Sequence, residues 1–112
     1  MRLARLSGAD PIYAFECFPW RAEKAKAWGA TEAWTLGQNV NAVDIIREKT
    51  NGLGIDVVFE AAWADNSIAQ AADMARLGGR VVLVGIPSED TLTMKHSMAR
   101  RKGLTIKMSR RM

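Results

Sequence analysis

Apolar runs of strand length alternate with amphipathic segments of helix length along the whole chain. The segments 12–15, 55–61 and 80–85 are predicted to be buried strands, the last two around continuous apolar runs at 57–59 and 81–84, and a brief segment at 33–36 predicts another strand. A last segment, 104–108, alternates between apolar and polar residues as an edge strand does. Helices are predicted over the segments 1–7, 19–28, 41–50, 65–77 and 92–102. This alternation favours parallel strands joined by right-handed crossovers.

The predicted helices carry apolar residues at helical spacing, which indicates the faces that they bury. The residues expected to point inward are Phe18, Ala22, Ala25, Val43, Ile46, Ile68, Ala71, Ala72 and Ala75. Pro19 suits the first position of its helix, Asn41 can cap the third helix, and Asp65 or Ser67 can cap the fourth. Because the runs 57–59 and 81–84 are continuously apolar, helices are expected on both faces of the sheet, with the four tryptophans packed beneath helices.

The composition is that of a soluble globular domain. Of the 112 residues, 48% are hydrophobic and 25% are charged, which argues against disorder, and this length predicts one domain over 1–112. No apolar run approaches the roughly 20 residues that a membrane-spanning helix needs, so no membrane partner is expected. Cys17 is the only cysteine, which excludes an intramolecular disulfide and predicts a reducing, cytoplasmic location.

Positive charge collects near the end of the sequence. The net charge is +4, and the cations that crowd this end are Arg100, Arg101, Lys102, Lys107, Arg110 and Arg111. Such a cluster can meet nucleic acid or an anionic surface. No aromatic residues are interleaved with it for base stacking, so we interpret it as a solvated face and expect no nucleic-acid partner.

Several short sequence segments occur together in the order and spacing that one enzyme family has. These are Gly8-Ala9-Asp10, Glu16 with Arg21, Gly29-Ala30-Thr31, the runs 50–62 and 78–87, and Ser109-Arg110-Arg111. With them the chain resembles the medium-chain, zinc-dependent alcohol and polyol (sorbitol-type) dehydrogenases over essentially its whole length. The resemblance implies an α/β fold: an incomplete Rossmann-like, doubly wound, mainly parallel sheet that lacks the first strand and the glycine-rich loop.

The same resemblance implies a set of cofactor-binding residues. Glu16 corresponds to the acidic residue that binds the adenosine ribose hydroxyls, and its charge favours NAD because it would repel a 2′-phosphate. Arg21 matches a basic residue beside the adenosine. The remaining matches are Val84, Gly85 and Ile86, in the segment whose backbone faces the nicotinamide carboxamide, and Arg111, near the cofactor phosphates.

Several features depart from that family. No Gly-x-Gly-x-x-Gly turn leads from a strand into a helix, and Gly52-Leu53-Gly54 precedes a strand, so it cannot aim a helix N-terminus at a phosphate. Catalytic zinc needs several cysteine, histidine or carboxylate ligands; Cys17 and His96 are the only residues of their types, so no zinc is expected. Trp63 stands where relatives carry a glycine, and its indole is expected to fill the cleft.

Three single residues also have structural interpretations. Glu60 ends a predicted strand, and we expect it to accept hydrogen bonds from loop amides and not to act as an acid catalyst. Cys17 is expected to be a half-buried thiol, and His96 to lie on a basic surface helix.

These features predict an alcohol-dehydrogenase-like nucleotide-binding fragment, inactive as an oxidoreductase by itself, that binds NAD or adenine nucleotides weakly at most. Two alternatives stay open: an NAD-binding subunit of a split zinc-dependent dehydrogenase, and a non-catalytic interaction module that uses the basic C-terminal face. The gap left by the first strand is expected to be closed by the remaining strands, filled by a neighbouring molecule, or left loose. Since relatives pair their last strand across a two-fold axis, we expect a homodimer or larger oligomer through exposed strands including 104–108.

Overall fold

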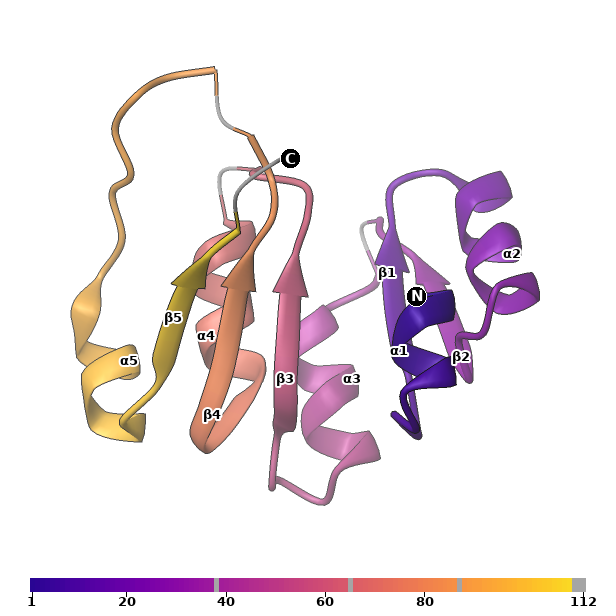
Figure 1. Cartoon of the computed structure of the whole chain (residues 1–112), viewed down its shortest axis with the longest axis horizontal. Coiled ribbons are helices and arrows are strands. Elements are labelled where there is room, and N and C mark those ends of the chain that lie inside the picture. The colour runs from indigo at the N-terminus through magenta and orange to yellow at the C-terminus, as the bar shows by residue number, and fades with distance from the viewer. Residues whose placement is uncertain (38, 65, 87, 110–112) are drawn as a thin grey trace. The chain divides into compact units, whose positions relative to one another are not determined.

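The computed structural model describes residues 1–37, 39–64, 66–86 and 88–109. Helices and strands alternate along the chain in the predicted order (Figure 1). The contacts divide the chain into two compact units, Met1–Ala42 and Val43–Met112. The single domain expected over 1–112 stays a prediction.

The first unit is a strand–helix–strand crossover preceded by a short helix. Its elements are α1 (Arg2–Leu6), β1 (Tyr13–Glu16), α2 (Pro19–Ala27) and β2 (Glu32–Thr35). The two strands are parallel, as predicted, with Tyr13 opposite Glu32 and Glu16 opposite Thr35. Pro19 occupies the first helical position, where its missing N–H leaves no helical hydrogen bond unmade.

Small residues form the core of the first unit. Ala14 of β1 and Ala25 of α2 are buried together with Ala30, which follows α2. Arg5 fastens α1 to the turn after α2, because its Nε and Nη2 atoms donate to the carbonyl oxygen of Gly29 at 3.0 and 2.8 Å. The same Nη2 also donates to the hydroxyl of Thr31 at 2.9 Å.

Three aromatic residues of this unit are exposed, which corrects the expectation that they pack under helices. Phe18, Trp20 and Trp28 are 50%, 57% and 56% exposed. Helix α2 turns its alanine face, Ala22 and Ala25, toward the interior, and the bulky rings lie outside that face. Trp34, in contrast, is half-buried on β2 and stacks on Phe15 of β1, with ring centroids 5.1 Å apart.

The second unit contains a three-stranded parallel sheet in the order β3-β4-β5. Its elements are β3 (Ile55–Glu60), α4 (Ser67–Met74), β4 (Ala75–Leu83), α5 (His96–Lys102) and β5 (Thr105–Met108), and they follow α3 (Ala42–Lys49), which begins at the boundary between the units. In the ladder, Val58 lies opposite Val81, and Val81 lies opposite Ile106. The arrangement is the Rossmann-like crossover pattern that the sequence predicts.

The β3–β4 ladder is interrupted near its start. Ile55 lies opposite Ala75 but Val57 lies opposite Arg80, so residues 76–79 bulge out of the register. Backbone approaches backbone closely at this bulge: a Cβ on Gly54 would lie 2.8 Å from the Arg76 nitrogen, and one on Gly79 would lie 2.9 Å from the Arg76 oxygen. Only glycine fits at these two positions without a shift of the backbone.

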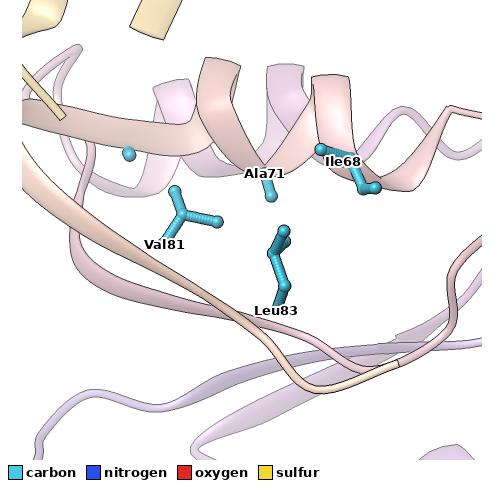
Figure 2. Close-up of a cluster of buried hydrophobic side chains, with 5 residues drawn as sticks. Ile68, Ala71, Val81 and Leu83 are labelled. Carbon is cyan, nitrogen blue, oxygen red and sulfur yellow. The ribbon is translucent and has the colours of Figure 1, made fainter. Parts of the chain in front are cut away.

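Helix α4 covers one face of this sheet and creates the core of the unit. Figure 2 shows Ile68 and Ala71 of the helix directed toward Val81 and Leu83 of β4. Val81 and Leu83 are 1% and 2% exposed. The predicted inner face of this helix is confirmed for Ile68, Ala71 and Ala72, which are buried. Ala75 is also buried, but it is the first residue of β4 and does not belong to the helix, contrary to the prediction from the sequence.

The opposite face of β3 is not buried, contrary to the prediction for this apolar run. Val57 and Phe59 are 40% and 62% exposed, whereas Val58 packs against the core beneath α4. Alternate residues of a strand point to opposite faces, so a helix on one face buries every second side chain. An apolar run reports the hydrophobicity of both faces but does not determine which faces a helix covers.

Some element ends differ from the predicted ones. Helix α4 is preceded by Asn66 as its N-cap residue and ends at Met74, before the glycine pair. Ser67, a predicted cap, is instead the first helical residue and exchanges hydrogen bonds with the backbone of Ala64; Asp65 lies outside the described residues. Helix α5 begins at His96 and not at Leu92. None of the helices in the described ranges is long and apolar enough to span a membrane.

Lys102 binds the C-terminal end of helix α4. Its Nζ atom donates to the carbonyl oxygens of Ala72, Asp73 and Ala75 at 2.9, 2.7 and 2.8 Å. The last carbonyls of a helix lack intrahelical partners, so a lysine docked there satisfies them and complements the negative end of the helix dipole. Burial lowers the pKa of Lys102; the carboxylate of Asp73 opposes this lowering and the charge of Arg47 adds to it. The prediction that Lys102 belongs to a solvated face was therefore wrong.

Candidate nucleotide-binding site

Glu16 ends β1 at the carboxyl edge of the first sheet. It is half-buried, and its carbonyl oxygen accepts the hydrogen bond of the Leu36 amide at 2.8 Å, which continues the parallel ladder beyond β2. Helix α2 starts three residues later, at Pro19. Ligands of open α/β sheets bind beyond the carboxyl ends of the strands, so Glu16 lies where the resemblance requires a ribose-binding carboxylate.

Arg21 lies in the first turn of α2 and is held against two aromatic rings. Its guanidinium carbon is 5.3 Å from the ring centroid of Phe18 and 5.2 Å from that of Trp20. Lys24 also contacts the ring of Trp20, at 5.8 Å. Glu16 and Arg21 thus occupy successive elements of one compact unit, β1 and α2, a carboxylate followed by a cation.

Val84, Gly85 and Ile86 follow β4 in the second unit. The amides of Val84 and Gly85 both donate to the carbonyl oxygen of Glu60, at 2.7 and 3.1 Å, which fixes this segment against the end of β3. A hollow of about 530 Å³ lies here, with Val84, Gly85 and Ile86 among its lining residues together with Trp63. These predicted residues therefore line one hollow at the carboxyl end of β4.

Glu60 organises the loop beside that hollow. It is 4% exposed, and its Oε1 atom accepts hydrogen bonds from the amides of Ala62 at 2.8 Å and Trp63 at 2.5 Å. The expectation that Glu60 binds loop amides is confirmed. A Cβ on Gly85 would lie 3.1 Å from Glu60 Oε2 and 3.0 Å from the Trp63 backbone, so the loop and the segment after β4 pack tightly.

Trp63 adopts a backbone conformation that favours glycine. Its φ is +50°, in the left-handed region. The indole is half-buried; it packs against the core cluster around Ile68 and Leu83 and forms part of the wall of the hollow. The family resemblance implies a glycine of relatives at this position, and the positive φ gives that glycine a physical reason. The indole packs against the core, as expected, but the hollow beside it stays open, so the expectation that this indole fills the cleft was wrong.

The described residues do not form a metal site. No three histidine, cysteine, aspartate or glutamate side chains come together in 1–37, 39–64, 66–86 and 88–109. Cys17 is exposed, which corrects the half-buried thiol expected from the sequence, and His96 is also exposed. This donor set does not fit the catalytic zinc of dehydrogenases. Arg111, predicted near the cofactor phosphates, lies outside the described residues.

Comparison with known proteins agrees with this architecture. The family described as zinc-binding dehydrogenase matches residues 1–112, so the chain belongs to that family. Sorbitol dehydrogenase of Bacillus subtilis is 32% identical over 91 residues, which are 81% of this chain and 26% of that protein. L-threonine 3-dehydrogenase of Caldanaerobacter subterraneus is 33% identical over 105 residues, 93% of this chain and 30% of that protein.

Solved structures show the same fold. The 2R,3R-butanediol dehydrogenase of Bacillus subtilis superposes with a TM-score of 0.87 at 30% identity, over 96% of this chain and 30% of that one. Alcohol dehydrogenase TADH of Thermus sp. ATN1 gives a TM-score of 0.85 at 30% identity, over 96% of this chain and 31% of that one. The chain spans about a quarter to a third of the length of these relatives.

Proposed function

We propose that this chain binds the adenosine part of an NAD-type nucleotide, weakly, through Glu16 and Arg21. The observation that carries the proposal is the place of Glu16: a half-buried carboxylate at the carboxyl end of a parallel strand, followed by a helix that presents a cation. A carboxylate there accepts hydrogen bonds from ribose hydroxyls and disfavours a 2′-phosphate. NAD is therefore the favoured cofactor class.

Weak affinity follows from the pyrophosphate part of the ligand. Dinucleotide sites hold the pyrophosphate with backbone amides of a glycine-rich turn at a helix N-terminus. The 112 residues contain no Gly-x-Gly-x-x-Gly turn, and Gly52-Leu53-Gly54 lies between α3 and β3 and so leads into a strand. With no zinc ligands gathered in the described residues, we infer that these residues contribute nucleotide recognition and are not an oxidoreductase by themselves.

Replacing Glu16 with glutamine is expected to weaken ADP-ribose binding about tenfold, because the neutral amide loses the charge-assisted hydrogen bonds to the ribose. The dissociation constants of both chains would be measured by NMR titration with millimolar ADP-ribose. Glu23→Gln, an exposed carboxylate of α2 that pairs with Lys26, is the matched control. Equal affinities of the wild type and Glu16→Gln, or no binding by the wild type, would contradict the proposal.

We also propose that β5 pairs with a second copy of the chain. Ser109 donates its amide to Leu83 of β4 at 2.9 Å, so by the alternation of strand hydrogen bonds the amides of Ile106 and Met108 face away from β4. All four residues of β5 are exposed, and an edge of free amides is a template for pairing.

Ile106→Pro is accordingly expected to convert a dimer into a monomer. Proline removes the outward amide of Ile106 while the ladder to β4 keeps its own hydrogen bonds. Light scattering after size-exclusion chromatography gives the mass of the wild type, the proline variant and the control Ile106→Val. A monomeric wild type, or a proline variant that stays dimeric, would show that β5 is not the interface.

A further inference from the structure

The first unit holds an unusual concentration of cations stacked on aromatic rings. Four such contacts lie within residues 2–28: Arg21 on Phe18, Arg21 on Trp20, Lys24 on Trp20, and Arg2 on Trp28. Proteins contain roughly one significant contact of this kind per 70–80 residues. Three of the four converge on the start of α2, the helix that follows Glu16.

Arg21 is the only one of these cations that contacts two rings. Its guanidinium carbon lies 5.3 Å from the ring centroid of Phe18 and 5.2 Å from that of Trp20, the two residues on either side of Pro19. An exposed arginine normally samples many rotamers, and fixing it costs conformational entropy when a ligand binds. Two ring contacts made before binding remove part of that cost.

Pro19 fixes the backbone between the two aromatic residues. Phe18 is the extended N-cap residue of α2, with φ −119° and ψ 135°, and Pro19 occupies the first helical position. The Arg21 amide donates to the Phe18 carbonyl at 3.1 Å, which sets Arg21 in the first turn directly above Phe18. The backbone therefore places both rings and the guanidinium in one preformed arrangement.

We propose that Phe18 and Trp20 are positioning residues that hold the Arg21 guanidinium ready for an adenine nucleotide. The inference rests on the proposed binding of adenosine by Glu16 and Arg21, and it adds the two residues that prepare Arg21. A guanidinium held over aromatic rings still has N–H donors that can meet ribose and phosphate oxygens. Neither ring has to touch the nucleotide for this role.

The chain supplies a matched control at the other end of the same helix. Trp28 is 56% exposed, close to the 57% of Trp20, and it also carries a stacked arginine, Arg2, at 5.8 Å. It follows Trp20 by eight residues, about 12 Å along a helix, and so lies far from the carboxyl end of β1. A loss of exposed tryptophan as such would affect both positions equally.

The test uses the full 112-residue chain with ADP-ribose as the probe. Phe18→Leu and Trp20→Leu are each expected to raise the dissociation constant about two- to fivefold, the range of an exposed cation–ring contact, and Trp28→Leu to leave it unchanged. In the ligand-free chain, the side-chain proton resonances of Arg21 are expected upfield of their ordinary positions, and to move downfield in Phe18→Leu and Trp20→Leu.

The ADP-ribose affinities and the Arg21 resonances together distinguish failure of the proposed function from failure of the positioning role of Phe18 and Trp20. If the wild type does not bind ADP-ribose, the proposed function fails, while the Arg21 resonances still show whether the rings hold the guanidinium. If ADP-ribose binds but Trp20→Leu and Trp28→Leu have equal affinities, or if the Arg21 resonances are unshifted in the wild type, Phe18 and Trp20 are not positioning residues. Replacing Arg21 with glutamine should abolish any difference between the Trp20 and Trp28 variants.

Discussion

Replacing Trp63 with alanine is expected to lower the free energy of unfolding by about 2 kcal/mol. The glycine variant is expected to be about 1 kcal/mol more stable than the alanine variant. Both substitutions remove a half-buried indole from the core cluster, which costs part of the 3–5 kcal/mol of a fully buried tryptophan. Glycine alone relieves the left-handed backbone at φ +50°. That relief of 1–2 kcal/mol exceeds the 0.4–1 kcal/mol that glycine loses through the entropy of the unfolded chain.

The control for this ranking is Trp34, on strand β2. A strand residue has an extended backbone, so Trp34→Gly is expected to be less stable than Trp34→Ala. Urea unfolding of the four variants gives the two differences. Alanine more stable than glycine at position 63 would mean that the loop does not hold Trp63 in the left-handed region in solution.

Replacing Lys102 with methionine is expected to lower the free energy of unfolding by about 2 kcal/mol. The substitution keeps an apolar stem but leaves the carbonyl oxygens of Ala72, Asp73 and Ala75 without the ammonium donor. Hydrogen bonds to charged groups contribute about 1.5–3 kcal/mol each. Solvent reaches this partly buried position, so the three hydrogen bonds together contribute less than the total of those values. Arg101→Met, at the exposed neighbouring position on α5, is expected to change stability by less than about 0.5 kcal/mol.

The effect of Lys102 also depends on pH in a defined direction. Burial lowers its pKa in the folded chain below 10.5, so between the lowered value and 10.5 the unfolded chain binds more protons at this site. Stability rises with pH wherever the unfolded state binds more protons. The difference in unfolding free energy between the wild type and Lys102→Met should therefore grow as the pH rises through that window. A difference that shrinks there would show that the pKa is raised and not lowered.

The order of helices and strands could be predicted because it depends on local pattern. Strand-length apolar runs gave β3 and β4, and a proline at a helix start gave the beginning of α2. The same pattern did not predict that Phe59 would be exposed, because coverage of a face depends on which helices pack there. It also placed Trp20 and Trp28 under helices, although the alanine face of α2 is the one that packs inward.

The candidate site, like the fold, could be predicted from the sequence only in part. Glu16 and the segment 84–86 could be placed at strand ends from the sequence, because the carboxyl ends of strands are readable from pattern and family resemblance. The docking of Lys102 on α4 could not, since it joins residues 27–30 positions apart with no periodic signal. The left-handed backbone of Trp63 had one signal only, the glycine of relatives, because a tryptophan in itself predicts the opposite conformation.

The bulge between β3 and β4 has a consequence for how this sequence can vary over evolutionary time. Gly54 and Gly79 both lie against the backbone of Arg76, closer than any side chain permits. Random mutation at either codon therefore meets purifying selection from the geometry of the sheet, whatever ligand the protein binds. A lineage that lost nucleotide recognition would let Glu16 drift while it still retained these two glycines.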